Sequence, residues 1–242
     1  MDLVIDIGNS KAKIALYDEK TVVERFCFDQ LALSDVESIL ASHPDVDQAI
    51  VSTTRRRDLQ LEIFLTNTLA KVVLFDPATT RTPLCNCYRT PHTLGGDRFA
   101  AAVAAWNRFP GCEIVIFDFG TALTIDRVNA AGEYLGGNIS LGMAMRFMAL
   151  NNNTDCLPLC NADNYSTEDR FGTDTYSAIM LGVTGGILME VEGYIAYLTK
   201  QNPQIKIFFT GGDALYFEKR IKNTIFVEYD AVLNGLHLIL NY

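Results

Sequence analysis

The chain has 242 residues, 49% of them hydrophobic and 20% charged, which is typical of a globular protein with one large domain or two modest ones. Its formal net charge of −9 argues against nonspecific binding to nucleic acid, and the basic run Arg55–Arg57 is expected to be the solvated start of a helix. The N-terminus opens into a strand pattern without a basic leader, and the weakly charged stretch from Tyr176 to Met189 is too short to span a bilayer. We therefore expect a cytoplasmic protein with no membrane and no nucleic-acid partner.

The first half of the chain combines three strands with an alternation of helices and strands. Short runs rich in apolar residues predict strands at 3–6, 12–17, 22–28, 48–52 and 72–75, and helical spacing predicts helices at 35–42 and 57–69. This order predicts an α/β half with an antiparallel start.

The second half begins in the same way. A meander of strands is predicted at 113–118, 122–128 and 134–140, followed by a helix at 142–150, an irregular polar loop at 151–165, a long helix from 175 to about 200, a strand at 205–209 and a last helix at 231–241. The loop is a candidate lid or substrate wall. We place the domain boundary near Phe109–Gly111, which gives an N-terminal half of residues 1–110 and a C-terminal half of residues 111–242.

Two hairpins carry the same polar pattern. Asp6-x-Gly8-x-Ser10 and Asp118-x-Gly120-Thr121 each follow an apolar strand, and they lie 112 residues apart. A carboxylate can hold a cation, a glycine lets the backbone approach a ligand, and a hydroxyl can donate to phosphate. One copy alone is explained by an ordinary turn. Two copies predict a duplicated fold whose hairpins clamp one polyphosphate across a cleft.

A third polar segment lies between the halves. Gly95-Gly96-Asp97-Arg98 leads into an Ala-rich helix that ends near Trp106. As a structural residue, Asp97 is the N-cap of this helix. As a functional residue, it is a base for a small hydroxyl-bearing substrate, with Arg98 as an anion clamp. The two interpretations are compatible and both stay open.

The remaining sequence signals are weaker. Gly211-Gly212, after the strand at 205–209, can accommodate an adenosine moiety at the start of a helix. Glycines at 182, 185, 186 and 193 permit close contact of the long helix with a neighbour, within the chain or between chains. Six cysteines and three histidines lack the paired spacing of zinc sites, so we expect free thiols.

Taken in order, these motifs resemble the type III pantothenate kinases over essentially the whole chain. The matching segments are Asp6-x-Gly8-Asn9-Ser10, Tyr88-x-x-Pro91-x-x-Leu94-Gly95-x-Asp97-Arg98, Asp118-Phe-Gly120-Thr121-Ala122, Thr175-x-x-Ala178-Ile179 and Thr210-Gly211-Gly212-Asp213. The resemblance implies a duplicated actin-like (ribonuclease H-like) α/β fold with two similar halves around a nucleotide cleft. It also implies ATP-dependent phosphorylation of pantothenate to 4′-phosphopantothenate, the first step of coenzyme A biosynthesis, by a homodimer that uses a monovalent cation (potassium or ammonium) and Mg²⁺ with ATP.

The resemblance also assigns roles to residues by matching position. Asp97 is the catalytic proton acceptor, and Asp118 binds the monovalent cation. The residues implied to bind ATP are Asp6, Ile7, Gly8, Asn9, Ser10, Lys11, Ala12, Lys13, Thr121, Gly211 and Gly212, with Asp6 a further candidate for contact with Mg²⁺. The residues implied to bind pantothenate are Tyr88, Gly95, Gly96, Asp97, Arg98 and Thr175. Ser10 replaces the usual Thr and keeps the hydroxyl, whereas Gly96 replaces a frequent Ala and is expected to loosen its turn.

Two alternatives remain at this point. One is an actin-like kinase for another small hydroxyl substrate. The other is a nucleotide-binding transcriptional accessory protein, against which the acidic composition and the lack of a helix-turn-helix signature both count.

Overall fold

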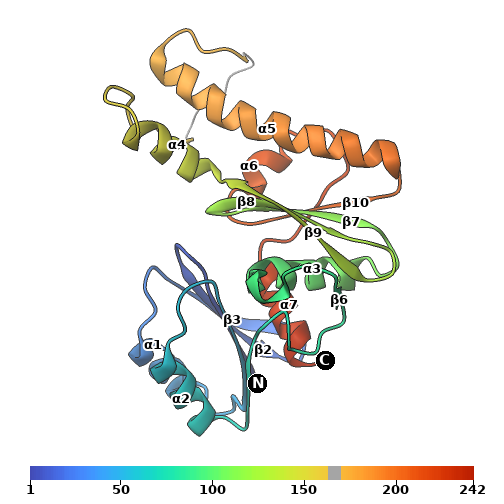
Figure 1. Cartoon of the computed structure of the whole chain (residues 1–242). Helices are drawn as coiled ribbons and strands as arrows, with labels where there is room; N and C mark the ends of the chain where they lie inside the picture. Colours follow the sequence, from blue (N-terminus) through green and yellow to red (C-terminus); the bar gives the residue numbers. More distant parts are fainter. Residues whose placement is uncertain (163–169) are drawn as a thin grey trace. The chain divides into compact units, whose positions relative to one another are not determined.

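A computed structural model describes residues 1–162 and 170–242 of the chain (Figure 1). Packing divides the chain into two compact units. The first unit contains residues 1–111, 128–136 and 230–242, and the second contains 112–127 and 137–229. The predicted halves assign 128–136 and 230–242 to the C-terminal half, whereas packing groups both segments with the first unit. The helix at the C-terminus packs against the helix that follows Gly95, which explains the grouping of residues 230–242.

The first unit is built on a mixed five-stranded sheet in the order β3-β2-β1-β4-β5. Its strands are β1 (Asp2–Ile7), β2 (Ala12–Asp18), β3 (Thr21–Phe28), β4 (Gln48–Thr53) and β5 (Lys71–Leu74). Strand β1 pairs antiparallel with β2 and parallel with β4, so the sheet combines an N-terminal meander with crossover strands. The five strands predicted for this half are confirmed.

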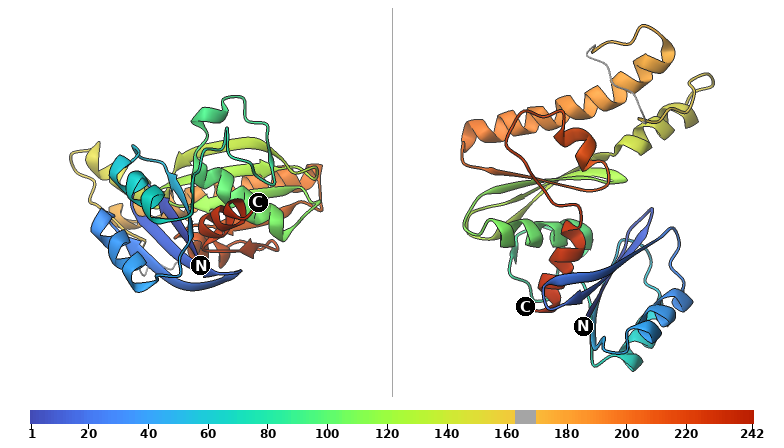
Figure 2. Two further views of the ribbon diagram at one scale, coloured as in Figure 1. Left: turned by 90° about the horizontal axis from the view of Figure 1, so that it is seen from below. Right: turned by 180° about the vertical axis from the view of Figure 1, so that it is seen from behind.

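The two faces of this sheet separate by residue parity. Leu3, Ile5 and Val51 belong to a buried apolar cluster that includes side chains of α1 (Leu33–Ser42) and α2 (Leu59–Thr68). The alternate residues of β1 and β4 contact α3 (Gly96–Arg108) and α7 (Ala231–Leu240) on the other face. Figure 2 shows α7 beside the strand that carries the N-terminus. The period of two along each strand therefore decides which residues meet the α3–α7 layer.

Helices α3 and α7 approach each other very closely. A Cβ atom added at Gly235 of α7 would lie 1.8 Å from the carbonyl oxygen of Ala100 in α3. Five alanines and Val103 in the interior of α3 keep its side chains short. The Ala-rich composition thus permits the close backbone contact between α3 and α7.

A polar network joins the start of β1 to α7. The Asp2 carboxylate accepts hydrogen bonds from Asn241 and Gln48 and pairs with His237 Nε2 at 2.8 Å. His237 also stacks on the Tyr17 ring, with the two centroids 4.0 Å apart. Burial lowers the pKa of His237, and the hydrogen bonds lower the pKa of Asp2 despite its desolvation. Neutral His237 and ionised Asp2 therefore stabilise this unit at neutral pH.

The second unit contains the strand order β11-β10-β7-β8-β9. Its elements are β7 (Ile114–Phe119), β8 (Ala122–Val128), β9 (Glu133–Leu141), α4 (Met143–Asn152), α5 (Thr175–Gln201), β10 (Lys206–Thr210), α6 (Ala214–Glu218) and β11 (Phe226–Val227). The first residues of β9 belong to the first unit, where they pair with β6 (Cys85–Asn86) ahead of the short 3₁₀ helix η1 (Pro91–Thr93). The predicted meander and the long helix are confirmed, whereas β6 and β11 are too short to give a sequence signal.

Helix α5 crosses the upper part of Figure 1 and buries one face in the core of the second unit. It is longer than the weakly charged stretch recognised in the sequence, and by length and composition alone it could cross a membrane, so the argument from shortness was wrong. A core helix passes the same test. Val183, Ile187 and Val191 of α5 belong to the buried apolar cluster that also contains β7 and β10 side chains, so one face of α5 packs against this core.

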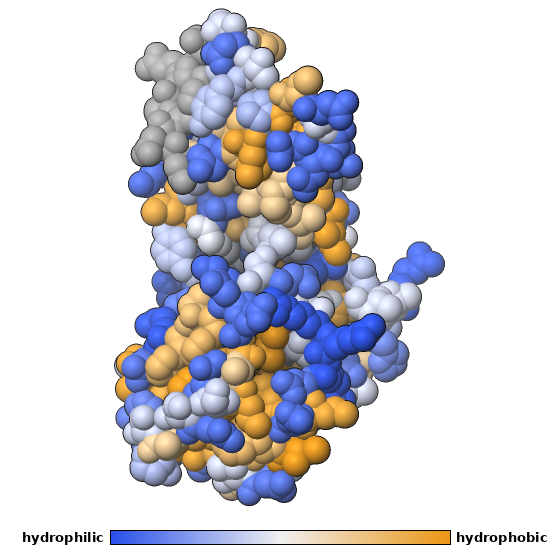
Figure 3. Space-filling view, turned by 90° about the vertical axis from the view of Figure 1, so that its left-hand side faces the viewer, coloured by the Kyte–Doolittle hydropathy of each residue, from blue (hydrophilic) through white to orange (hydrophobic). Residues whose placement is uncertain are grey.

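Apolar side chains also reach the surface of both units. Figure 3 shows hydrophobic and hydrophilic residues intermixed on one face. The exposed apolar residues include Leu59 and Ile63 of α2 and Met189 of α5.

Residues 153–162 of the predicted polar loop are irregular, and 163–165 lie outside the described residues. The role of this loop as a lid or wall stays a prediction.

Candidate functional site

The β1–β2 hairpin of the first unit forms a tight polar turn. Asp6 and Lys13 are paired across the two strands, and the Gly8 N–H donates to the Lys11 carbonyl at 3.0 Å. A Cβ at Gly8 would lie 3.1 Å from the same carbonyl, so glycine suits the turn. Ser10 and Lys11 are exposed at its tip, whereas Asp6 is buried at its base. The turn presents a hydroxyl and a cation to solvent beside a carboxylate, as a phosphate loop requires.

Sequence reasoning missed Arg55 as a neighbour of this hairpin. Its guanidinium donates to the Asn9 carbonyl at 2.6 Å, which brings a positive charge to the tip of the turn. The expectation that Arg55–Arg57 start a helix was wrong, because α2 begins at Leu59 and Asp58 caps it by accepting from the Gln60 and Leu61 N–H groups. Asp58, a good N-cap residue placed three residues after Arg55, was the available signal.

The first turn of α3 carries the predicted catalytic carboxylate. Gly95 is the N-cap and Asp97 is the second helical residue, so the interpretation of Asp97 as the N-cap was wrong. Asp97 Oδ1 accepts the Arg98 N–H at 2.8 Å. A Cβ at Gly95 would lie 2.4 Å from the same oxygen, so the missing side chain at position 95 makes room for the carboxylate. The N-terminal end of a helix favours a negative charge at this position.

Gly96 is not the loose point that the sequence comparison suggests. It is buried, and a Cβ there would lie 2.7 Å from Ser52 Oγ and 3.2 Å from the Phe75 ring. Ser52 stands at the end of β4, in register with Asp6 of β1. The start of α3, with Asp97, therefore packs directly against the strand end beside Asp6. The structure brings these two predicted site segments together within one unit.

Tyr88 and Arg98 form a second cluster at the start of α3. The guanidinium carbon of the buried Arg98 lies 5.8 Å from the centre of the Tyr88 ring. Tyr88 packs on Tyr134, and Gly136, with φ of +99°, leaves room for the Tyr88 ring at a distance of 3.1 Å from the absent Cβ. An aromatic ring and a buried guanidinium suit a substrate with both apolar and anionic parts.

The β7–β8 hairpin of the second unit is held from two sides. A Cβ at Gly142 would lie 2.2 Å from the Gly120 carbonyl oxygen, and the Gly142 N–H donates to the Thr121 carbonyl at 3.1 Å. Gly211, with φ of +93°, abuts the opposite side, where its Cβ would lie 2.4 Å from Asp118 Oδ1. The predicted residues at 118, 121, 211 and 212 therefore lie in one region of this unit.

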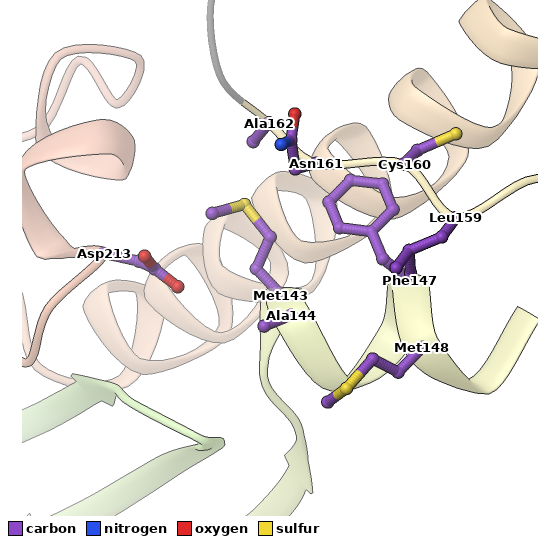
Figure 4. A pocket seen from close by; sticks show the side chains of 9 residues that line it. All are labelled: Met143, Ala144, Phe147, Met148, Leu159, Cys160, Asn161, Ala162 and Asp213. Atoms are coloured by element: carbon purple, nitrogen blue, oxygen red, sulfur yellow. The ribbon is translucent and has the colours of Figure 1, made fainter. Parts of the chain in front are cut away.

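A cavity of about 380 Å³ opens next to the Gly-Gly turn (Figure 4). Its walls are mainly apolar, with one carboxylate and one amide. The lining residues are Met143, Ala144, Phe147, Met148, Leu159, Cys160, Asn161, Ala162 and Asp213. The Asp213 carboxylate points toward Met143, and burial raises its pKa. A mainly apolar cavity with a few polar groups is the usual form of a small-ligand site.

The last predicted site residue, Thr175, is the first residue of α5 and is exposed. Asp174 caps this helix by accepting the Ser177 N–H at 2.9 Å, which fixes the backbone around Thr175. Within residues 1–162 and 170–242, no three His, Cys, Asp or Glu side chains form a cluster that could hold a metal ion.

The fold of the chain is similar to that of several solved structures. A solved structure from Sinorhizobium meliloti, provisionally described as a 2-dehydro-3-deoxygalactonokinase, aligns with a TM-score of 0.60 at 11% identity and covers 99% of this chain and 98% of its own. A structure from Campylobacter jejuni, provisionally described as a Baf family transcriptional activator, aligns with a TM-score of 0.61 at 22% identity over 99% and 97%. These similarities show the fold, which is the duplicated actin-like α/β fold that the sequence predicts.

The sequence comparisons then give the family. The profile of type III pantothenate kinases matches residues 2–197. A type III pantothenate kinase of Bacteroides fragilis is 41% identical over 242 residues, covering 100% of this chain and 98% of the relative. The chain belongs to the type III pantothenate kinase family, which confirms the resemblance read from its motifs.

Proposed function

We propose that the chain transfers the terminal phosphoryl group of ATP to the primary hydroxyl of pantothenate, giving 4′-phosphopantothenate, the first step of coenzyme A biosynthesis. The observation that carries this proposal is the first turn of α3, where Asp97 stands beside the buried Arg98, in a chain that matches the family model over residues 2–197. The test is formation of ADP by the purified chain with Mg²⁺-ATP, with and without pantothenate. ADP formation that ignores pantothenate but responds to another hydroxyl compound would favour a different substrate.

Asp97 acts as the base in this proposal. Its Oδ1 is occupied by the Arg98 N–H, which leaves the carboxylate oriented by its own helix turn. The substrate hydroxyl gives its proton to the carboxylate while Arg98 and Tyr88 hold the carboxylate end and the apolar part of pantothenate. Phosphoryl transfer needs positioning and charge neutralisation more than covalent chemistry. Asp97, Arg98 and Tyr88 therefore supply the positioning of pantothenate that the reaction needs.

The two hairpins bind the phosphates of ATP. The segment Asp6–Lys13 offers a carboxylate, a tight turn and exposed Ser10 and Lys11, which suits a hydrated Mg²⁺-phosphate group. Thr121 adds a second hydroxyl from the other hairpin. Mg²⁺, when bound, would neutralise charge on the phosphates, and Asp6 is the residue of this chain that would hold it through its carboxylate oxygens. Gly211, Gly212 and the adjacent cavity receive the adenosine part, whose apolar ring faces suit walls such as Met143 and Phe147.

Asp118 holds a monovalent cation in this scheme. Asp118 Oδ1 and the Phe119 carbonyl oxygen lie 2.4 and 2.6 Å from the position that a Cβ at Gly211 would take, so carboxylate and carbonyl oxygens, the ligands that hard cations prefer, are close together. Activity should therefore depend on potassium or ammonium, with sodium a poor substitute, and Asp118→Asn should weaken that dependence together with turnover. Equal rates of the wild type in sodium-only and potassium buffers would rule out this role.

The active unit is a homodimer in which α5 contributes to the interface. Among the described residues, a Cβ added at Gly182, Gly185 or Gly193 would meet no atom within 4 Å, so these glycines serve no close contact inside the described chain. Each costs roughly 1 kcal/mol relative to Ala in a helix, and close approach of a second chain would offset that cost. Met189 lies on the same helix face and is 55% exposed. We place the dimer in the cytoplasm.

A further inference from the structure

Ser52 occupies a buried position between two parts of the proposed site. It is in register with Asp6 across the parallel β1–β4 pair, so the two side chains point to the same face of the sheet. Ser52 is 1% exposed, and among the described residues its Oγ has no hydrogen-bond partner. Buried hydroxyl groups almost always have a partner, because an unmade hydrogen bond is costly.

The same oxygen also sets the position of α3. A Cβ at Gly96 would lie 2.7 Å from Ser52 Oγ, so the hydroxyl fills the space that a side chain at position 96 would take. Alanine at position 52 would leave the neighbouring Phe75 ring as the nearest contact of such a Cβ, at 3.2 Å. Simple filling of space does not require a polar atom here, since the adjoining aromatic ring is apolar.

We propose that Ser52 is a positioning residue for phosphoryl transfer, an inference that rests on the proposed function. Its hydroxyl donates to the Asp6 carboxylate when the hairpin holds the nucleotide, and its Oγ fixes how closely the turn with Asp97 approaches that strand end. Neighbouring strands lie about 4.8 Å apart, a span that rotation of the serine about χ1 can bridge. Ser52 therefore couples the nucleotide side of the site to the acceptor side without touching either ligand.

Two variants separate these roles. Ser52→Ala removes the hydroxyl and keeps the Cβ, so it should weaken binding of Mg²⁺ with a non-hydrolysable ATP analogue about tenfold, measured by titration calorimetry. Its melting temperature should equal or exceed that of the wild type, because the substitution removes a buried hydroxyl that has no partner in the described ligand-free chain. Equal nucleotide affinity of Ser52→Ala and wild type would overturn the proposed hydrogen bond, as would a large fall in melting temperature without a change in affinity.

The steric role is tested with Gly96→Ala and the double variant Ser52→Ala/Gly96→Ala. Gly96→Ala should lower kcat/KM for pantothenate, and removing Oγ in the double variant should recover at least half of that loss on a logarithmic scale while nucleotide binding stays weak. A double variant as impaired toward pantothenate as Gly96→Ala would overturn the steric role. A wild type that binds nucleotide but does not turn over pantothenate would refute the proposed function, whereas the affinity comparison would still decide the role of Ser52 toward Asp6.

Discussion

Gly211 offers a direct perturbation of the second hairpin. Replacement by Ala places a Cβ 2.4 Å from Asp118 Oδ1 and 2.6 Å from the Phe119 carbonyl oxygen, and it holds an L-residue at φ of +93°. Asp213 donates its N–H to the same Phe119 carbonyl at 3.1 Å, so the turn cannot retreat without losing that bond. The substitution should therefore strain both the turn and the Asp118 carboxylate.

The expected cost of Gly211→Ala follows from two terms. A left-handed backbone costs an L-residue about 1–2 kcal/mol, and overpacking a closed contact costs about 1–3 kcal/mol. The sum of about 2–5 kcal/mol corresponds to a fall in melting temperature on the order of 10 °C for a chain of this length. Displacement of Asp118 should also reduce the stimulation of turnover by potassium.

Gly212→Ala is the matched control for stability. An added Cβ there meets no described atom within 4 Å, and the glycine has no positive φ. Its melting temperature should stay within about 2 °C of the wild type. Thermal unfolding followed by circular dichroism compares the three proteins, and equal melting temperatures for Gly211→Ala and Gly212→Ala would refute the packing argument.

Three further predictions concern other parts of the molecule. Asp97→Asn keeps an oxygen for the Arg98 N–H and should fold normally, yet lose about 10²–10⁴ in turnover in an ADP-release assay; near-full turnover would leave Asp97 without a catalytic role. Because burial lowers the pKa of His237, the unfolded chain takes up a proton below about pH 6.5 that the folded chain resists, so the melting temperature should fall as the pH drops below that value. His237→Gln should be less stable at neutral pH and lack this part of the slope, and identical pH profiles would contradict the assignment. Gly185→Leu should shift the protein toward monomer in sedimentation and lower pantothenate turnover with it, whereas a fully active wild-type monomer would exclude the dimer proposal.

The sequence predicts best what depends on local periodicity. The apolar runs of β1 and β7, each followed by an Asp-x-Gly pattern, predict both hairpins because the strand, the turn and the polar residues are close neighbours in the chain. The family follows from the same motifs in order. The strands and helices around them are placed within a few residues.

Local periodicity and short motifs do not predict contacts between segments that are distant in the sequence. Helix α7 joins the first unit because Gly235 admits the Ala100 carbonyl, a fit that no periodicity shows. Asp97 is not the N-cap because α3 already begins at Gly96, with Gly95 as its N-cap. Gly95 has no side chain and therefore leaves space for the Asp97 carboxylate. Ser52 reads as the end of an ordinary strand, and its place beside Asp6 and Gly96 depends on strand register and on where α3 packs.

The central claim is the transfer of a phosphoryl group from ATP to pantothenate. Purified chain is incubated with Mg²⁺-ATP and potassium, with pantothenate or with a panel of sugars and hydroxy acids, and the products are identified by mass. We predict ADP together with a product heavier than pantothenate by one phosphoryl group, formed by the wild type and largely lost in Asp97→Asn. Phosphorylation of another compound in the panel, with pantothenate returned unchanged, would contradict the claim.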